Sequence, residues 1–213
     1  MNKIVCIDSL DQEHVVNQIP GVRIVTVGDN NLIKFYEGTK FENCEFVMNS
    51  NCKVTFGSSI FKIRKIRIFM NSFCEVEVAE NFSCLEADFR LQENNTFLVI
   101  GRDCMFSSEI KIYASDGHAI FSLSDPKQAI NLGGGIRIGN HVWIGRNVCL
   151  LKNTQIGSNS VVGYGSVVTK KFECENSLIV GFPERLLRQV LIGIENPQNY
   201  LTDCFARSSI KIG

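Results

Sequence analysis

The hydrophobic positions between Ile138 and Phe172 recur at every sixth residue. Aliphatic residues occupy six consecutive anchor positions without a slip: Ile138, Ile144, Leu150, Ile156, Val162 and Val168. Four residues after each anchor, the chain has Val142, Val148, Thr154, Ser160, Ser166 and Phe172, five of which are small or β-branched. Apolar residues on one face recur at every second position in a strand and about every 3.6 positions in a helix, so neither element explains a period of six. A hexapeptide period indicates a parallel β-helix.

Each hexapeptide is long enough for one short strand and one tight turn. Three of them close a triangular coil of about eighteen residues, and successive coils stack at roughly the 4.8 Å spacing of neighbouring strands. We expect the aliphatic anchors to point into the prism and the small residues to fill its corners. Glycine directly follows four of the six anchors, where the backbone must turn: Gly139, Gly145, Gly157 and Gly163.

The period of six weakens towards the N-terminus but remains visible. Met48, Val54, Ile60 and Ile66 keep a spacing of six, which predicts that they lie in the interior. The interior residue types shift there to phenylalanine, cysteine and methionine, and glycine becomes rare. The segment from Val22 to about Phe97 is therefore predicted to be a degraded part of the same β-helix.

A loop is predicted where the period breaks. The step from Ile112 to Ile138 is not a multiple of six, so part of the chain must leave the prism between these two positions. The segment 114–135 is the candidate, because Asp125-Pro126 and Gly133-Gly134-Gly135 are turn signals within it. The arithmetic allows an insertion of 2, 8, 14 or 20 residues. Long excursions from a regular scaffold usually carry function.

The two ends of the chain lack the hexapeptide pattern. Residues 1–21 predict a short N-terminal cap, with a strand over 4–7 and a helix over 11–19 that Pro20-Gly21 ends. A cap is needed because an open solenoid end exposes apolar core and unpaired strand edges. Residues 22–182 are the predicted β-helix domain. Residues 183–213 predict a short amphipathic helix over 184–191 and a tail.

Four motifs in the C-terminal half occur in the order and spacing of a known family. They are Asp116-Gly117-His118, Ile138-Gly139-x-x-Val142-Trp143-Ile144-Gly145, Gly163-Tyr164-Gly165-Ser166-Val167-Val168-Thr169-Lys170 and Gly181-Phe182-Pro183. On these motifs the chain resembles the hexapeptide-repeat acyltransferases, in particular the O-acetyltransferases of maltose, galactosides, antibiotics and bacterial surface polysaccharides. The resemblance implies an all-β, left-handed parallel β-helix, a homotrimer, and acetyl-CoA as the acyl donor.

Histidine is the expected base of the acyl transfer, because its pKa lies near neutrality and the acceptor hydroxyl must lose a proton. The chain has three histidines: His14, His118 and His141. His118 lies where the repeat gives way to the loop, and it matches the catalytic histidine of the family. His141 is its rival, on the outward side of a hexapeptide turn. His14 falls in the predicted cap.

The resemblance also implies a groove for coenzyme A along the outside of the prism. Trp143, the only tryptophan, should point outwards, and relatives place it beside the cofactor and the active site; packing at a trimer interface is its other interpretation. The remaining residues assigned to the groove by motif position are Gly145, Arg146, Gly163, Tyr164, Thr169 and Lys170, and the cations available to the phosphates are Lys170, Lys171, Arg185 and Arg188.

Two groove residues depart from the family pattern. Arg146 replaces a small residue, and Tyr164 replaces an alanine. A tyrosine at this position would narrow the groove or contact the acceptor, which would suit a bulky sugar acid. The polar residue that relatives place opposite the histidine has no clear match, and Glu86 or Asp88 could serve.

Composition narrows the classes of partner. Twenty-two basic and 22 acidic residues cancel, which argues against nucleic acid or an anionic membrane as the main partner. No apolar run approaches the roughly 18 residues of a membrane span, and the polar N-terminus is unlike a signal peptide, which predicts a cytoplasmic protein. Nine scattered cysteines are then expected to be free thiols. The alternating cations of 62–67 are either a solvated face or a strip that contacts an anionic acceptor.

The sequence therefore favours an acetyl-CoA-dependent O-acetyltransferase that acts on a sugar of a bacterial surface polysaccharide, including a sialic acid-containing capsule, or on its precursor. Three alternatives stay in view. An N-acetyltransferase of amino-sugar nucleotides usually has a larger N-terminal part than residues 1–21. A γ-class carbonic anhydrase needs three converging zinc-binding histidines, and here no two histidines are close in sequence, so no metal is expected. A non-enzymatic scaffold would leave His118 and Trp143 unexplained.

Overall fold

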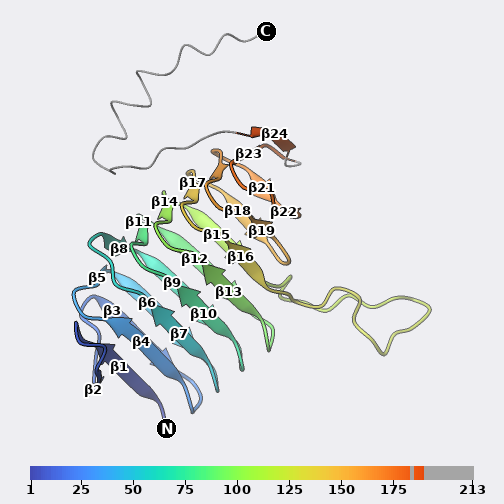
Figure 1. The fold of residues 1–213 in the computed structure, drawn as a ribbon. Helices are drawn as coiled ribbons and strands as arrows, with labels where there is room; N and C mark the ends of the chain where they lie inside the picture. The colour runs from blue at the N-terminus through green and yellow to red at the C-terminus, as the bar shows by residue number, and fades with distance from the viewer. Residues whose placement is uncertain (183–184, 190–213) are drawn as a thin grey trace, which may run out of the picture.

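The computed structural model of the chain describes residues 1–182 and 185–189. Its strands wind into a three-sided solenoid with one mainly parallel sheet on each side (Figure 1). We name the sides face A, face B and face C. Each coil runs from a strand of face B to a strand of face A and then to a strand of face C. The prediction of an all-β, parallel β-helix is confirmed.

Face A has nine strands, in the order β2 (Glu13–Val16), β1 (Lys3–Ile7), β4 (Leu32–Tyr36), β7 (Lys53–Phe56), β10 (Glu75–Val78), β13 (Phe97–Ile100), β16 (Ile136–Ile138), β19 (Gln155–Ile156) and β22 (Lys171–Phe172). Face B has seven: β3 (Val22–Thr26), β6 (Cys44–Met48), β9 (Ile66–Met70), β12 (Ala87–Leu91), β15 (Ile110–Tyr113), β18 (Cys149–Leu151) and β21 (Val167–Val168). Face C has eight: β5 (Lys40–Glu42), β8 (Lys62–Arg64), β11 (Ser83–Cys84), β14 (Met105–Phe106), β17 (Trp143–Ile144), β20 (Val161–Val162), β23 (Ser177–Val180) and β24 (Arg185–Gln189).

The coils have two different lengths. In the N-terminal half, from β4 to β15, the sequence number rises by 21 to 23 from one coil to the next, and Val54, for example, pairs with Val76, 22 residues later. After the loop, Ile138 pairs with Ile156, and the sequence number rises by only 18. We call these the wide and the narrow coils. The prediction of an unchanged period of six through Ile60 is therefore wrong. Its side chain is 80% exposed, because the wide coil places it in the turn before β8.

The interior of the wide coils is filled with larger side chains than that of the narrow ones. Phe41, Phe46 and Phe56 pack together, with ring centroids 5.2 to 6.2 Å apart. After the loop the buried anchors are aliphatic, as predicted: Ile138, Ile144, Leu150, Ile156, Val162 and Val168. A longer perimeter encloses a wider cross-section, which only bulky residues fill without voids.

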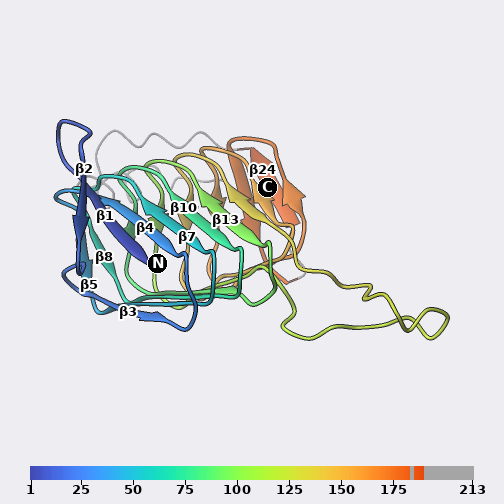
Figure 2. The same ribbon diagram turned by 90° about the horizontal axis from the view of Figure 1, so that it is seen from below.

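The predicted loop, residues 114–135, lies between β15 and β16 and leaves the prism where face B passes to face A. Leu98 pairs with Ile136, and the sequence number rises by 38 in this coil, against 18 in the narrow coils that follow. Of the insertion lengths that the arithmetic allowed, the structure therefore has the longest. Figures 1 and 2 show the loop projecting far from one edge of the solenoid.

The N-terminal segment contains two strands where one strand and a helix were predicted. The strand over 4–7 is confirmed as part of β1, but residues 13–16 form β2, antiparallel to β1. Oδ1 of Asp8 accepts hydrogen bonds from the backbone N–H groups of Leu10 (2.8 Å) and Gln12 (3.0 Å). These bonds close a turn that reverses the chain, so β2 pairs with the outer edge of β1 instead of forming a helix.

At the C-terminal end, residues 185–189 form β24, antiparallel to β23, so the helix predicted over 184–191 is wrong. Among the described residues, β23 is the last parallel strand of face C, and its outer edge offers backbone hydrogen bonds that favour a strand over an isolated helical turn. The predicted tail lies outside the described residues. Within the described part of the chain, no helix is long and apolar enough to cross a bilayer.

Candidate active site

His118 lies at the base of the loop, where three polar side chains hold the backbone. Nδ2 of Asn131 donates to the carbonyl oxygen of His118 (2.9 Å) and to Oδ2 of Asp116 (2.8 Å). Nζ of Lys152 donates to the same Oδ2 of Asp116 (2.6 Å) and to the carbonyl oxygen of Asn131 (2.7 Å). We call Asp116, Asn131 and Lys152 the loop clamp. It fixes the backbone beside His118 while the imidazole remains exposed.

The loop clamp contains an ion pair between Lys152 and Asp116. The hydrogen bond from Lys152, and after it the one from Asn131, lowers the pKa of the Asp116 carboxyl. Asp116 is therefore ionised near neutral pH, and its charge holds together two segments that are distant in sequence. Sequence reasoning found Asp116 through its motif but missed Asn131 and Lys152. Only the stacking of β18 below the loop brings Lys152 to it, and no local pattern encodes that contact.

Beyond the clamp the loop is a narrow ribbon with apolar side chains in solvent. The N–H of Ile130 donates to the carbonyl oxygen of Ile120 (2.8 Å), and Phe121 bridges Ala129 in antiparallel fashion. Its large hydrophobic side chains are about half to fully exposed: Ile120, Phe121, Leu123, Ile130 and Leu132. Such a cluster on a projecting segment is typical of a surface that contacts another molecule.

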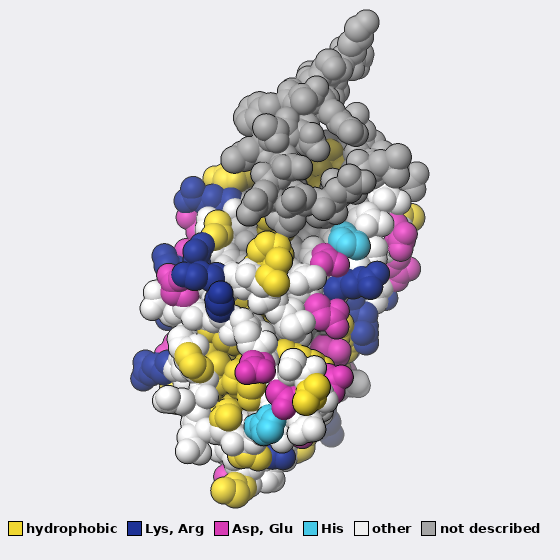
Figure 3. Space-filling model, turned by 60° about the vertical axis from the view of Figure 1, so that its left-hand side comes forward, with side chains coloured by type: hydrophobic (Ala, Val, Ile, Leu, Met, Phe, Trp, Pro, Cys, Tyr) yellow, Lys and Arg dark blue, Asp and Glu magenta, His cyan; other side chains and the backbone are white. Residues whose placement is uncertain are grey.

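Trp143 lies on face C, as predicted for an outward residue, and its side chain is half-buried. It is in register with Met105 of β14 and Val161 of β20, and Val161 is in register with Leu178 of β23. These four residues form an apolar row across face C. Seen from this side, hydrophobic side chains run down the middle of the surface and charged side chains gather along both flanks (Figure 3).

Within one chain, the structure does not bring His118 and Trp143 together. His118 belongs to the edge between faces B and A, whereas Trp143 lies on face C, across the prism from that edge. The predicted cofactor residues divide in the same way. Four of them lie at the edge between faces C and B: Gly145, Arg146, Gly163 and Tyr164. Thr169 and Lys170 lie at the edge that carries the loop, and Lys171 is in β22 of face A. Arg185 and Arg188 are in β24 of face C. The side chain of Arg188 is outside the described part.

Arg146 and Tyr164 are neighbours at the edge between faces C and B. The N–H of Gly165 donates to the carbonyl oxygen of Arg146 (3.0 Å), and the Tyr164 side chain is 73% exposed. The Arg146 guanidinium donates to Oε1 of Glu109 at 2.5 Å, and this bond raises the pKa of Arg146 and lowers that of Glu109. Glu109, which sequence reasoning missed, therefore holds the cation that departs from the family pattern.

Gly145 and Gly163 allow neighbouring coils to approach closely. A Cβ atom on Gly145 would lie 2.9 Å from the carbonyl oxygen of Val162, and one on Gly163 would lie 2.7 Å from Cγ1 of Val180. The N–H groups of both glycines donate to the next coil, at 2.8 and 2.9 Å. Both glycines thus serve the packing of the edge on which Arg146 and Tyr164 lie.

The other two histidines contact carboxylates at some distance from the loop. Nε2 of His141 lies 3.1 Å from Oδ2 of Asp103, at the edge between faces A and C, and His141 has φ of 53°. Nε2 of His14 lies 2.7 Å from Oδ2 of Asp8, which lowers the pKa of Asp8. In the described part of the chain, no group of three histidine, cysteine, aspartate or glutamate side chains converges as metal ligands.

Glu86 and Asp88, the two candidates to assist His118, lie at or near the edge between faces C and B, not beside the loop of their own chain. The basic strip is largely neutralised. Lys62 and Arg64 contact Glu42 at 3.1 and 3.6 Å, and Arg67 contacts Glu45 at 3.2 Å.

Residues 135–170 match the family model of bacterial transferase hexapeptide repeats (six repeats). The structure of the polysialic acid O-acetyltransferase OatWY resembles this one with a TM-score of 0.63 and 26% identity, over 85% of this chain and 96% of that chain. The polySia-specific acetyltransferase NeuO has the same fold, with a TM-score of 0.52 and 22% identity, over 87% of this chain and 98% of that chain. No curated protein matches the sequence. The predicted resemblance to hexapeptide-repeat acyltransferases is confirmed.

Proposed function

We propose that the chain is an acetyl-CoA-dependent O-acetyltransferase whose acceptor is a sugar hydroxyl of a bacterial surface polysaccharide or its precursor. The observation that carries the proposal is the exposed imidazole of His118, next to a backbone fixed by the loop clamp. The similarity to the polysialic acid O-acetyltransferase OatWY supports a sialic acid polymer as the first acceptor to try.

The proposed chemistry assigns one proton path to His118. A neutral ring nitrogen accepts the proton of the acceptor hydroxyl as the oxygen attacks the acetyl carbonyl carbon. The new C–O bond forms, the C–S bond breaks, and the imidazolium returns the proton to the departing thiolate. The clamp contributes by orientation, because a base displaced by about 1 Å can lose a factor of roughly 100 in rate.

Exposed cations at the loop edge and on face A fit the phosphates of the acyl donor. Lys170 and Lys171 follow one another there, and both side chains are exposed. Arg185 is exposed on β24, on the same face as Trp143. Trp143 and Tyr164 offer aromatic surface across the prism from Lys170 and Lys171. A donor that contacts both Lys170–Lys171 and Trp143–Tyr164 would lie between two chains.

That separation supports a homotrimer whose clefts lie between neighbouring chains. Cyclic symmetry repeats one heterologous contact, so the loop of each chain would meet face C of the next. The exposed apolar residues of the loop and the apolar row of Met105, Trp143, Val161 and Leu178 are chemically complementary for such a contact. His118 of one chain would then face Trp143 of its neighbour.

The proposed location is the cytoplasm, where acetyl-CoA is made and thiols stay reduced. The described part of the chain has eight cysteines, and all eight are free. Most are buried, and burial raises the pKa of the Cys104 thiol to about 12, so it is an inert core residue. This pattern fits a reducing compartment.

The function is tested by thiol release from acetyl-CoA in the presence of free sialic acid, polysialic acid, maltose, galactosides and amino-sugar nucleotides. We expect release above the hydrolysis background with a sialic acid polymer and an O-acetyl ester in the product by mass spectrometry. An amide product on an amino sugar would establish the N-acetyltransferase alternative. Absence of release with every acceptor would contradict the proposal.

A further inference from the structure

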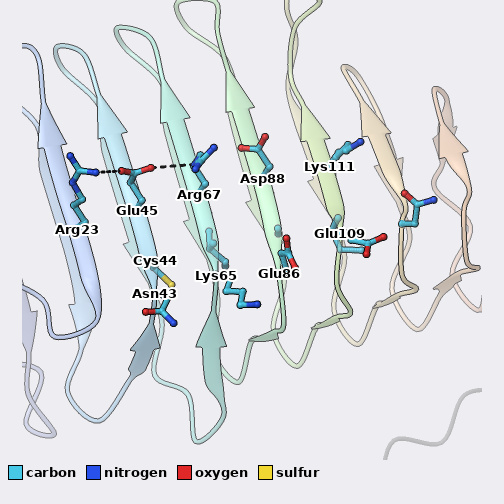
Figure 4. Close-up of a pocket in the computed structure, with 14 residues that line it drawn as sticks. Arg23, Asn43, Cys44, Glu45, Lys65, Arg67, Glu86, Asp88, Glu109 and Lys111 are labelled. Carbon is cyan, nitrogen blue, oxygen red and sulfur yellow. Dashed lines mark hydrogen bonds and ion pairs between the residues drawn. The ribbon is translucent and has the colours of Figure 1, made fainter.

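A groove of about 740 Å³ runs along the edge between faces C and B, with Asn147 at its C-terminal end (Figure 4). One of its walls is a row of charged side chains on neighbouring strands of face B. Arg23, Glu45, Arg67, Asp88 and Lys111 are in register from β3 to β15, so positive and negative charges alternate. We call it the edge groove. It crosses four strand spacings, roughly 19 Å in all, which is longer than a single sugar ring.

Much of the charge in the edge groove is already paired. Glu45 contacts Arg23 at 3.0 Å and Arg67 at 3.2 Å, as the dashed lines of Figure 4 show. Oδ2 of Asp88 accepts from Nε of Arg90 at 2.9 Å. These pairs hold the walls in place and leave the remaining polar groups for a ligand.

Three charged groups of the edge groove remain available to a ligand. Within the described part of the chain, Lys65, Lys111 and Glu86 form no ion pair. Asp88 is not among them, because its Oδ2 accepts from Arg90 and its Oδ1 is buried, out of reach of a ligand hydroxyl.

The edge groove is continuous with the proposed donor side of the site. Glu109 lines it and also accepts the hydrogen bond from Arg146, and Asn147 lines its C-terminal end. A chain lying in the groove would therefore reach the Arg146–Tyr164 edge at one end. This continuity is what a long acceptor needs if one of its units is to react.

We propose that the edge groove binds an acidic glycan chain, as the part of the acceptor that does not react. This inference rests on the proposed function. Ammonium groups of Lys65 and Lys111 bind sugar carboxylates, whereas Glu86 accepts hydrogen bonds from ring hydroxyls. Of the groove's charged groups that form no ion pair within the described part of the chain, two are ammonium groups and one is a carboxylate, which favours an anionic ligand that also carries hydroxyl groups.

The test compares acceptors of graded length in the wild-type protein and in the Lys65→Ala/Lys111→Ala double variant. Polysialic acid fractions are the long probes and free sialic acid is the short one. We expect the KM for long chains to rise roughly 5- to 20-fold, since each exposed lysine contributes a factor of about 2 to 5. The KM values for free sialic acid and acetyl-CoA should stay unchanged, and added salt should reduce the difference between the proteins. Lys40→Ala, which removes an exposed cation of face C outside the groove, is the matched control.

Calorimetric binding of polysialic acid without acetyl-CoA separates this inference from the proposed function. Weaker binding to the double variant would support the groove even if no sugar were acetylated. Equal KM values at every chain length, or equal loss for short and long acceptors, would overturn it. A change of oligomeric state in the variant, measured by sedimentation, would also overturn it, because the groove would then be an interface between chains.

Discussion

Nζ of Lys152 lies 2.6 Å from Oδ2 of Asp116, and this contact joins a regular coil to the base of the loop that carries His118. Lys152→Met keeps the length of the side chain but removes the ammonium. We expect kcat to fall roughly 10- to 100-fold, because the backbone beside His118 loses its anchor. The KM for acetyl-CoA should change less than about 5-fold, because about 1 kcal/mol at most is lost from a partly exposed pair.

Two comparisons make this prediction specific. Lys127→Met removes an exposed ammonium from the same loop, outside the clamp, and should retain wild-type kcat. Lys152→Arg keeps a donor and should recover much of the lost rate. If Lys127→Met lowers kcat as much as Lys152→Met, the clamp has no specific role in positioning.

The clamp also predicts a pH dependence with a definite sign. Its hydrogen bonds lower the pKa of Asp116 below that of the unfolded chain. The clamp therefore stabilises the loop above the unfolded pKa, and this contribution is lost as the pH falls through the lower, folded value. The protection factors for hydrogen exchange at the loop base, which are corrected for the intrinsic effect of pH, should decrease on acidification in the wild type. This decrease should be smaller in Lys152→Met, where the pKa is no longer lowered by the lysine.

Removal of the proposed base is the second prediction. His118→Ala should lower kcat by a factor of roughly 100 to 10,000, the usual range for loss of a general base. Acetyl-CoA binding, measured by calorimetry, should be unchanged. His14→Ala and His141→Ala are the controls, since their ring nitrogens contact Asp8 and Asp103 away from the loop. Wild-type turnover in His118→Ala would remove this histidine from the mechanism.

A pair of isoleucines tests the geometry of the wide coils. Ile66 is 1% exposed and Ile60 is 80% exposed, although their spacing in the sequence is six. Ile66→Ala should lower the free energy of unfolding by about 2 to 5 kcal/mol, the usual cost of truncating a buried isoleucine. Ile60→Ala should change it by less than about 0.5 kcal/mol. Equal losses in denaturant titrations would mean that the period of six does continue through Ile60.

Ile60 and Ile66 also show where the count in sixes predicts the fold and where it does not. Between Ile138 and Val168, paired strands are 18 residues apart and each anchor is buried, so counting in sixes is sufficient. Before the loop, longer strands such as β6 and β9 lengthen each coil, and a count in sixes moves gradually out of register. The cysteines could have indicated the length of a wide coil. Cys52 and Cys74 are separated by one such coil, and both are buried beside the corners of successive coils.

The sequence predicted those features of the candidate site that depend on residues close together in the chain. The turn before His118 and the outward direction of Trp143 follow from neighbouring residues in the sequence. The Lys152–Asp116 and Arg146–Glu109 contacts do not, because each joins segments that are far apart in the sequence. Which coil lies beside which depends on the insertion at the loop, whose length the sequence left open.

Ligand dependence is the fourth prediction. Acetyl-CoA at 100 times its Kd should stabilise the folded protein by about 2.7 kcal/mol through mass action, which raises the Tm measurably. A chelator should leave both the Tm and the acetyl transfer unchanged. Activity that disappears with the chelator and returns with zinc would instead favour the carbonic anhydrase alternative.

The last prediction concerns the clefts between chains. His118 and Trp143 lie on opposite sides of one prism, so a working cleft needs one residue from each of two neighbours. The protein should sediment as a trimer of about 72 kDa, three times its 23.9 kDa mass. His118→Ala and Trp143→Ala chains should each be poorly active alone. Co-expressed, they should recover part of the activity, because some clefts combine the intact His118 of one chain with the intact Trp143 of another. A fully active monomer would contradict the trimer, and a trimer without complementation would place both residues on the same chain's side of the cleft.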